Sequence, residues 1–192
     1  KSVRKGVKKS LMIVDMPFNT YKNKSQALKN CKKVIKETKC DGIKLEGGSK
    51  IKDIIKHLVN NKIPVMGHIG ITPQSQRGKF RYKGKNEKEK KNLLNDSKIL
   101  EEAGVFAIVL ECIEKKLSKK ITETIEIPTI GIGSSKFCDG QILVLDDLLG
   151  LTNSKIKFVK KYANFKSNIR NAVKKFGSDV KRGSYPSLKH SY

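Results

Sequence analysis

Short apolar runs alternate with longer amphipathic segments along most of this chain, and this alternation limits the possible folds more than any other feature. The runs are SLMIVD, GIKLE, IPVMGH, VFAIVLE, IPTIGIG and QILVLD. Between them, the apolar spacing predicts helices over 25–38, 50–60, 87–103 and 115–124, and a long amphipathic tail over 155–182. Continuous apolar strands separated by helices are typical of a parallel sheet whose faces are covered.

Six strand-helix units suit either a doubly wound sheet or most of a (β/α)8 barrel. The glycine-containing turns lack the spacing of a nucleotide-binding loop, which weakens the doubly wound alternative. The length of 192 residues predicts a single domain over 1–192, with 155–192 as a C-terminal helical extension of it. Because a closed barrel has eight strands, we expect a (β/α)8 barrel that lacks its first two strands, with two sheet edges left unpaired.

The formal net charge of +24 suggests a nucleic-acid-binding protein at first sight. However, only five of the 42 basic residues are Arg, and the lysines recur throughout the chain without an aromatic-interleaved patch. Four cysteines without a CxxC pair favour reduced thiols over a zinc or redox site. No apolar run reaches the roughly 20 residues of a membrane helix, so we expect a cytoplasmic protein without nucleic-acid or membrane partners.

Polar side chains follow four of the apolar runs where each predicted strand ends: Asp15, Glu46, His68 and Glu111. In a parallel barrel these ends share one face, which carries the active site. Lys44 is two residues before Glu46 and therefore points to the same side of its strand. A Lys and a Glu that face one interior suit an anionic substrate near a metal, and Asp15 and Glu46 offer the oxygen ligands that Mg²⁺ takes.

Each of these residues also has a structural interpretation. An acid after a strand often caps the next helix or solvates a loop, and His68 is as well suited to a structural role as to a catalytic one. Asp146 opens the stretch DDLLGL, for which we favour a helix start. The coincidence of four strand ends is what favours a site.

The stretches VDMPFNTY, DGIKLEGG, PVMGHIGITPQS, FAIVLEC and IPTIGIGSS…CDGQILVLDDLLG resemble, in order, the motifs of the ketopantoate hydroxymethyltransferase family. The resemblance runs from about residue 3 to residue 190. It implies a Mg²⁺-dependent (β/α)8 barrel that forms a homodecamer. Its reaction transfers a one-carbon unit from 5,10-methylenetetrahydrofolate to 3-methyl-2-oxobutanoate, in pantothenate and coenzyme A synthesis.

By the same resemblance, Asp15 is a metal ligand that also contacts the keto acid, and Glu46 completes the metal site. Lys44 holds the substrate carboxylate and His68 lines the substrate pocket. Glu111 is the proton acceptor, the general base that forms an enolate which attacks the folate methylene.

The chain departs from the family pattern in three places. It lacks an N-terminal stretch of roughly 65 residues with a VGDS motif, so we interpret it as a partial sequence, with an inactive remnant as the alternative. The loop over 72–86 is shorter and lacks the usual paired glycines, and GIGSS stands where the family has GIGAG; both changes bear on folate affinity. A Lys-rich nucleic-acid-binding protein and a Mg²⁺-dependent barrel lyase acting on 2-oxo acids remain the other hypotheses.

Overall fold

The computed structural model describes residues 1–74, 81–153 and 155–192. Its chain divides into two compact units, Lys1–Ile142 and Leu143–Tyr192. The units are described separately here, and a single domain over 1–192 stays a prediction.

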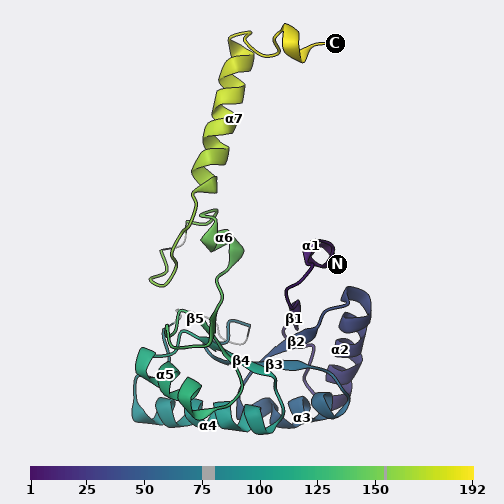
Figure 1. Ribbon diagram of the computed structural model, residues 1–192, viewed down its shortest axis with the longest axis vertical. Helices are drawn as coiled ribbons and strands as arrows, with labels where there is room; N and C mark the ends of the chain where they lie inside the picture. The colour runs from purple at the N-terminus through teal and green to yellow at the C-terminus, as the bar shows by residue number, and fades with distance from the viewer. Residues whose placement is uncertain (75–80, 154) are drawn as a thin grey trace. The chain divides into compact units, whose positions relative to one another are not determined.

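A curled sheet of six parallel strands forms the centre of the first unit (Figure 1). The strands pair in chain order, each with the next, so every connection is a crossover of the same kind. This arrangement confirms the predicted partial (β/α) barrel. The strands are β1 (Ile13–Asp15), β2 (Gly42–Glu46), β3 (Val65–Gly70), β4 (Ala107–Glu111), β5 (Thr129–Ile132) and β6 (Gly140–Gln141).

Helices lie along the outer side of this sheet (Figure 1). The predicted bounds are close to the observed ones, with α2 starting after the Asn23 cap, whose side chain accepts a hydrogen bond from the Gln26 amide. The helices of this unit are α1 (Ser2–Gly6), α2 (Lys24–Thr38), η1 (Ser49–Ile51), α3 (Lys52–Asn60), α4 (Glu87–Glu102) and α5 (Lys115–Thr124).

The core lies between the sheet and these helices. Side chains alternate along a strand, so Ile43 and Leu45 of β2 pack into the core, while Lys44 and Glu46 between and after them face the opposite side. In β4, Ile108 and Leu110 are likewise fully buried in the core, which sends Glu111 to the opposite face. In these two strands, burial of the apolar side chains in the core thus directs the alternating polar side chains to the opposite face of the sheet.

The second unit contains α6 (Leu145–Leu148), α7 (Phe165–Lys181) and the short helix η2 (Leu188–His190). Two predictions need correction. The run QILVLD is strand only at its first residue, because the chain leaves β5 after Gln141 and Val144 then caps α6. The tail over 155–182 is helical only from Phe165, where the Asn164 side chain accepts from the Ser167 amide and starts the helix. Asp146 lies in the first turn of α6, as predicted.

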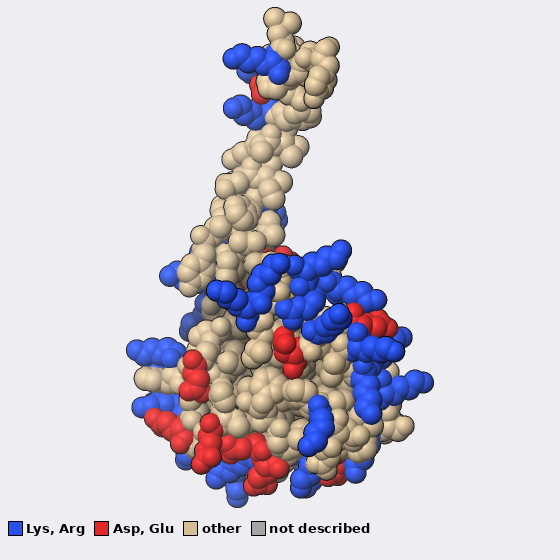
Figure 2. All heavy atoms as spheres, turned by 45° about the vertical axis from the view of Figure 1, so that its right-hand side comes forward, with Lys and Arg blue, Asp and Glu red and all other residues tan. Residues whose placement is uncertain are grey.

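Basic side chains cover much of one face of the chain. On the face shown in Figure 2, Lys and Arg side chains are spread widely, with fewer Asp and Glu side chains among them. All four cysteines are free thiols. Within the described residues, no helix is long and apolar enough to cross a membrane.

Candidate functional site

The register of the sheet brings the predicted polar residues together. Asp15 of β1 is the register partner of Lys44, and the Lys44 Nζ atom lies 3.0 Å from Asp15 Oδ2. Glu46 is the register partner of His68 on β3, and Glu46 Oε1 lies 3.7 Å from His68 Nδ1. Lys44 also lies 4.0 Å from Glu46 Oε1, because the two side chains share one face of β2.

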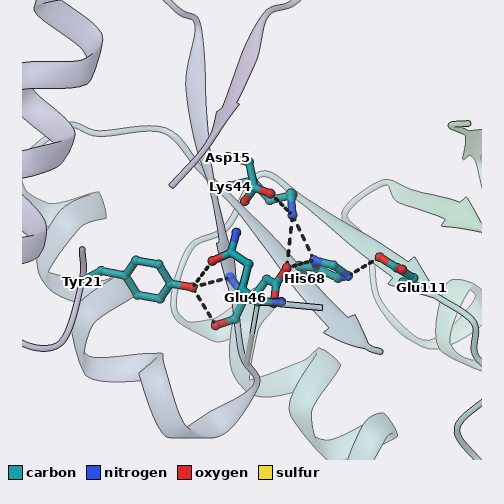
Figure 3. A network of polar contacts seen from close by, with 7 residues as sticks. Asp15, Tyr21, Lys44, Glu46, His68 and Glu111 are labelled. Carbon is teal, nitrogen blue, oxygen red and sulfur yellow. Dashed lines mark hydrogen bonds and ion pairs between the residues drawn. The ribbon is translucent and has the colours of Figure 1, made fainter. Parts of the chain in front are cut away.

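His68 is the centre of this network, with only 2% of its side chain exposed. Its Nδ1 atom lies 3.0 Å from Lys44 Nζ, and its Nε2 atom lies 3.2 Å from Glu111 Oε2. Figure 3 shows the resulting row of contacts from Asp15 through Lys44 and His68 to Glu111. Among the described residues, Nε2 is buried without a hydrogen bond of good geometry, so the carboxylate of Glu111 is near it but not aligned with it. Four strands, β1 to β4, each supply part of the row.

Glu46 is the most enclosed acid of the network. One of its oxygens, Oε2, accepts a hydrogen bond of 3.1 Å from the Gln74 amide. Burial raises the pKa of the Glu46 carboxyl, while His68, the Gln74 amide and Lys44 act in the opposite direction. Burial prevails because water is excluded from the carboxylate and the Lys44 ammonium lies 4.0 Å away. The carboxyl therefore takes up a proton more readily than an exposed one.

Tyr21 supports the backbone of the same strand. Its hydroxyl accepts from the Glu46 amide at 3.3 Å and lies 3.5 Å from both the Glu46 carbonyl oxygen and Gln74 Oε1. Burial is the main cause that raises the pKa of Tyr21, with the charges of Glu46 and Asp15 adding to it. Tyr21 therefore stays a neutral donor and acceptor beside the carboxylates.

Hydrogen bonds to the residues before and after Glu111 fix its backbone. The Ser134 hydroxyl donates to the Leu110 carbonyl at 2.7 Å and accepts from the Ile113 amide at 3.1 Å, so it braces the residues on either side of Glu111 and Cys112. Gly70, opposite Glu111 in the register, has φ +102°, and a Cβ there would overlap the Glu111 carbonyl oxygen. The end of β4 is therefore fixed by a small residue and a bridging hydroxyl.

Cys112 completes the turn after Glu111 with a φ of +50°, a conformation that non-glycine residues seldom adopt. Its amide donates to the Ile132 carbonyl at 2.8 Å, which secures the turn against β5. Burial, followed by the charge of Glu111, raises the pKa of the Cys112 thiol to about 11. The thiol is therefore protonated at neutral pH and is no candidate nucleophile.

The five site residues predicted from the sequence lie in one network: Asp15, Lys44, Glu46, His68 and Glu111. Sequence reasoning assigned no role to Tyr21, Gln74 or Ser134, although all three fall within motifs that it singled out, VDMPFNTY, GITPQS and GIGSS. The altered loop over 72–86 is described only in part, since residues 75–80 lie outside the described residues.

Asp15 and Glu46 are the ligands predicted for a magnesium ion. Within residues 1–74, 81–153 and 155–192, no three or more His, Cys, Asp or Glu side chains are grouped to hold a metal. Asp15 and Glu46 are a pair of carboxylates within 4.0 Å of one ammonium nitrogen. Mg²⁺ is commonly bound through one or two carboxylates, with water and substrate oxygens completing its shell. The pair therefore supplies the type and number of protein ligands that such an ion commonly takes.

Comparisons with known proteins identify relatives of this chain. The family model described as ketopantoate hydroxymethyltransferase matches residues 1–188. The chain is 60% identical over 192 residues to 3-methyl-2-oxobutanoate hydroxymethyltransferase of Pelagibacter ubique (strain HTCC1062), covering all of this chain and 74% of that relative. It is 50% identical over 195 residues to the enzyme of the same name from Helicobacter pylori (strain ATCC 700392 / 26695), covering 72% of it.

A third relative of that name, from Clostridium botulinum (strain Alaska E43 / Type E3), is 49% identical over 196 residues, with 71% of its length covered. Among solved structures, dihydrodipicolinate synthase from Agrobacterium tumefaciens str. C58 is 11% identical with a TM-score of 0.43, covering 73% of this chain and 50% of that one. The family match extends over nearly the whole chain and the three named relatives are about half identical to it or more. The chain therefore belongs to the ketopantoate hydroxymethyltransferase family.

Proposed function

We propose that this chain transfers a hydroxymethyl group from 5,10-methylenetetrahydrofolate to 3-methyl-2-oxobutanoate, which yields 2-dehydropantoate for pantothenate synthesis. The observation that carries the proposal is the row of contacts in which Lys44, His68 and Glu111 lie next to a pair of carboxylates. An anionic keto acid needs a cation to hold it, a Lewis acid to polarise it and a base to deprotonate it. The row offers residues for each of these tasks.

Asp15 and Glu46 would hold Mg²⁺, which when bound supplies a positive charge beside the keto acid's oxygens and favours loss of a neighbouring proton. Lys44 would bind the substrate carboxylate with its ammonium group. The side chain is about four-fifths buried and is already turned towards both acids. Its ammonium lies within 4.0 Å of both carboxylates, so a substrate carboxylate bound to it would lie next to the proposed Mg²⁺.

Glu111 would remove the C3 proton of the keto acid. The side chain is 19% exposed, and its Oε2 atom lies 3.2 Å from His68 Nε2. Its backbone is fixed by Ser134 and Gly70, so a base at this position keeps a constant direction. The carbanion left at C3 then forms a carbon–carbon bond to the methylene carbon of the folate. The bonds from that carbon to N5 and N10 break, and water supplies the hydroxyl oxygen. Tetrahydrofolate leaves, with one of its nitrogens taking the proton from Glu111 and the other a proton from the water.

His68 would orient the row rather than react. It contacts Lys44 through one ring nitrogen and Glu111 through the other, and only 2% of its side chain is exposed. The same proposal includes a location in the cytoplasm and assembly as a homodecamer. The particle mass in solution tests the assembly.

The proposal is tested by incubating the purified chain with 3-methyl-2-oxobutanoate in deuterium oxide. We expect C3 proton exchange that requires Mg²⁺, and formation of 2-dehydropantoate once the methylene folate is added. A chain that binds the keto acid with Mg²⁺ but neither exchanges the C3 proton nor forms product would contradict the proposal.

A further inference from the structure

A cleft lies between the amino-terminal halves of α4 and α5. Its volume is about 630 Å³. Leu94 and Leu117 contribute apolar surface, and Tyr82 contributes an aromatic ring. Its remaining lining includes the lysines Lys85, Lys90, Lys91, Lys116 and Lys120.

The lysine content of this cleft exceeds what the composition alone explains. Lysines are five of its eleven lining residues, whereas Lys and Arg together make up 42 of the 192 residues of the chain. Another cleft, of about 650 Å³ and lined in part by Gly47 and Ile69, has one lysine among its eleven lining residues. The positive charge is therefore concentrated in one of two clefts of the same size.

Most of these charges lack a carboxylate partner. Lys90 pairs with Glu87 at 2.6 Å, and the Glu114 carboxylate is engaged by the Leu117 amide at 3.0 Å, where it caps α5. Among the described residues, no ion pair involves the four other lysines of the cleft. Like charges held around one concavity attract a ligand with several negative groups.

The cleft is joined to the end of β4 by backbone hydrogen bonds. The Lys83 amide donates to the Cys112 carbonyl at 2.8 Å, and the Glu114 amide donates to the Lys83 carbonyl at 2.9 Å. Glu114, which lines the cleft, follows Glu111 by three residues, so their Cα atoms are at most ~11 Å apart. A ligand that reacts near Glu111 can extend one aromatic ring further and reach the lysines.

We propose that this cleft binds the p-aminobenzoyl and oligo-γ-glutamyl part of the folate co-substrate, an inference that rests on the proposed function. The ring would lie against Tyr82, Leu94 and Leu117, and the carboxylates of successive glutamates would meet Lys85, Lys116 and Lys120. The lysines would then select co-substrates with longer glutamate chains. The keto acid site, by contrast, handles a single carboxylate.

The test uses equilibrium binding of p-aminobenzoyl-triglutamate and p-aminobenzoyl-monoglutamate, which contain no reacting carbon. One variant combines Lys116→Glu with Lys120→Glu on α5. The matched control combines Lys32→Glu with Lys36→Glu on α2, a helix pair with the same spacing, exposure and change of charge. We expect the wild-type chain to prefer the triglutamate, and the cleft variant alone to lose roughly tenfold in affinity for it, with a loss that shrinks as salt rises.

Equal triglutamate affinity in the cleft and control variants would overturn the proposal, as would a wild-type chain without preference for the longer ligand. Tripolyphosphate serves as a separate arm: displacement of the triglutamate by an equal concentration of it, with no dependence on glutamate number, would show a general anion site and overturn the folate assignment. Circular dichroism of both variants establishes that they fold.

Turnover separates this proposal from the previous one. If the chain catalyses the transfer, the cleft variant should raise KM for the triglutamyl folate more than for the monoglutamyl folate, with kcat unchanged. If it catalyses no transfer but the binding difference remains, the proposed function fails and the cleft assignment stands. If transfer occurs and binding is the same in all three proteins, the cleft assignment fails alone.

Discussion

His68 faces Glu111 across 3.2 Å with its Nε2 atom, while its Nδ1 atom faces the ammonium of Lys44 at 3.0 Å. An ammonium group can only donate hydrogen bonds, so Nδ1 must accept one and the ring proton must reside on Nε2. We infer that the N–H of the imidazole lies on the side of the Glu111 carboxylate, 3.2 Å from it but without the alignment of a hydrogen bond. By occupying Nδ1 of His68, Lys44 therefore determines that the protonated ring nitrogen is the one that faces Glu111.

Glu111→Gln should abolish the proposed base while preserving the shape of its side chain. We expect the rate of C3 proton exchange to fall by roughly 10²–10⁴-fold, the usual contribution of a positioned base, with little change in keto acid affinity. Exchange is measured by the loss of the C3 proton signal in deuterium oxide. Mg²⁺-dependent exchange at near the wild-type rate would remove Glu111 from this role.

Lys44→Met should mainly weaken binding of the keto acid. A hydrogen bond to a charged group contributes about 1.5–3 kcal/mol, so KM should rise by roughly 10–100-fold. Lys36→Met on the exposed face of α2 is the control, and its KM should match that of the wild type. An unchanged KM in Lys44→Met would show that another cation holds the substrate carboxylate.

Glu46→Gln should stabilise the metal-free chain at neutral pH. Burial raises the pKa of this carboxyl above the ordinary value of 4.5, so the folded state binds its proton more tightly than the unfolded state. The stability contributed by that proton is complete below pH 4.5 and is lost as pH rises through the folded pKa. Glutamine mimics the protonated form and escapes this loss.

Urea unfolding between about pH 4.5 and pH 8 measures the effect. The advantage of the variant should grow with pH, and added Mg²⁺ should raise the urea midpoint of the wild type but not that of Glu46→Gln. A variant that is less stable than the wild type at pH 8 without metal would contradict the burial argument.

Ser134→Ala removes the hydroxyl that bridges the Leu110 carbonyl and the Ile113 amide. We expect a loss of stability of about 1–3 kcal/mol, because both backbone groups lose a partner. If the hydroxyl also holds Glu111 in place, kcat should fall while the KM of the keto acid stays constant. Ser134→Thr, which keeps the hydroxyl, should restore kcat at least in part; an equal kcat in all three proteins would limit Ser134 to stability.

Gly70→Ala should be among the most damaging single changes, since its positive φ costs a non-glycine residue about 1–3 kcal/mol and its Cβ would overlap the Glu111 carbonyl oxygen. Gly177→Ala in α7 is the matched control, because nothing lies within 4 Å of the added carbon there. The thermal midpoint should fall for Gly70→Ala and stay level or rise for Gly177→Ala. Similar midpoints for both variants would show that the end of β3 can relax without cost.

The strands β1 to β5 and the helices α2 to α5 were predictable because their apolar periodicity is unambiguous. The polar residues at the strand ends were predictable for the same reason: once Ile43 and Leu45 are assigned to the core, Lys44 and Glu46 can only face the other way. The sixth strand was not, since Ile142 and Val144 are apolar yet remain more than half exposed in this structure. An apolar run indicates residues that favour burial, but it does not show that a neighbouring strand is there to pair with them.

Tyr21, Gln74 and Ser134 could not be assigned from the sequence because they act through backbone contacts. The Tyr21 hydroxyl meets the Glu46 backbone and Ser134 braces Leu110 from 24 residues away. Such contacts depend on how loops return over the sheet, which residue spacing does not encode. The charged residues of the network could be identified from the sequence, whereas the residues that support their backbone could be identified only from the structure.

The pairing of the strands in chain order has a consequence for how the site is assembled during synthesis. Its residues come from four consecutive strands, and each new strand needs only the preceding one as its template. The contacts Asp15–Lys44, Glu46–His68 and His68–Glu111 can therefore form one after another as the polypeptide emerges. All residues of the proposed substrate-binding network precede α7 in the chain, so each of these contacts can form before α7 has been translated.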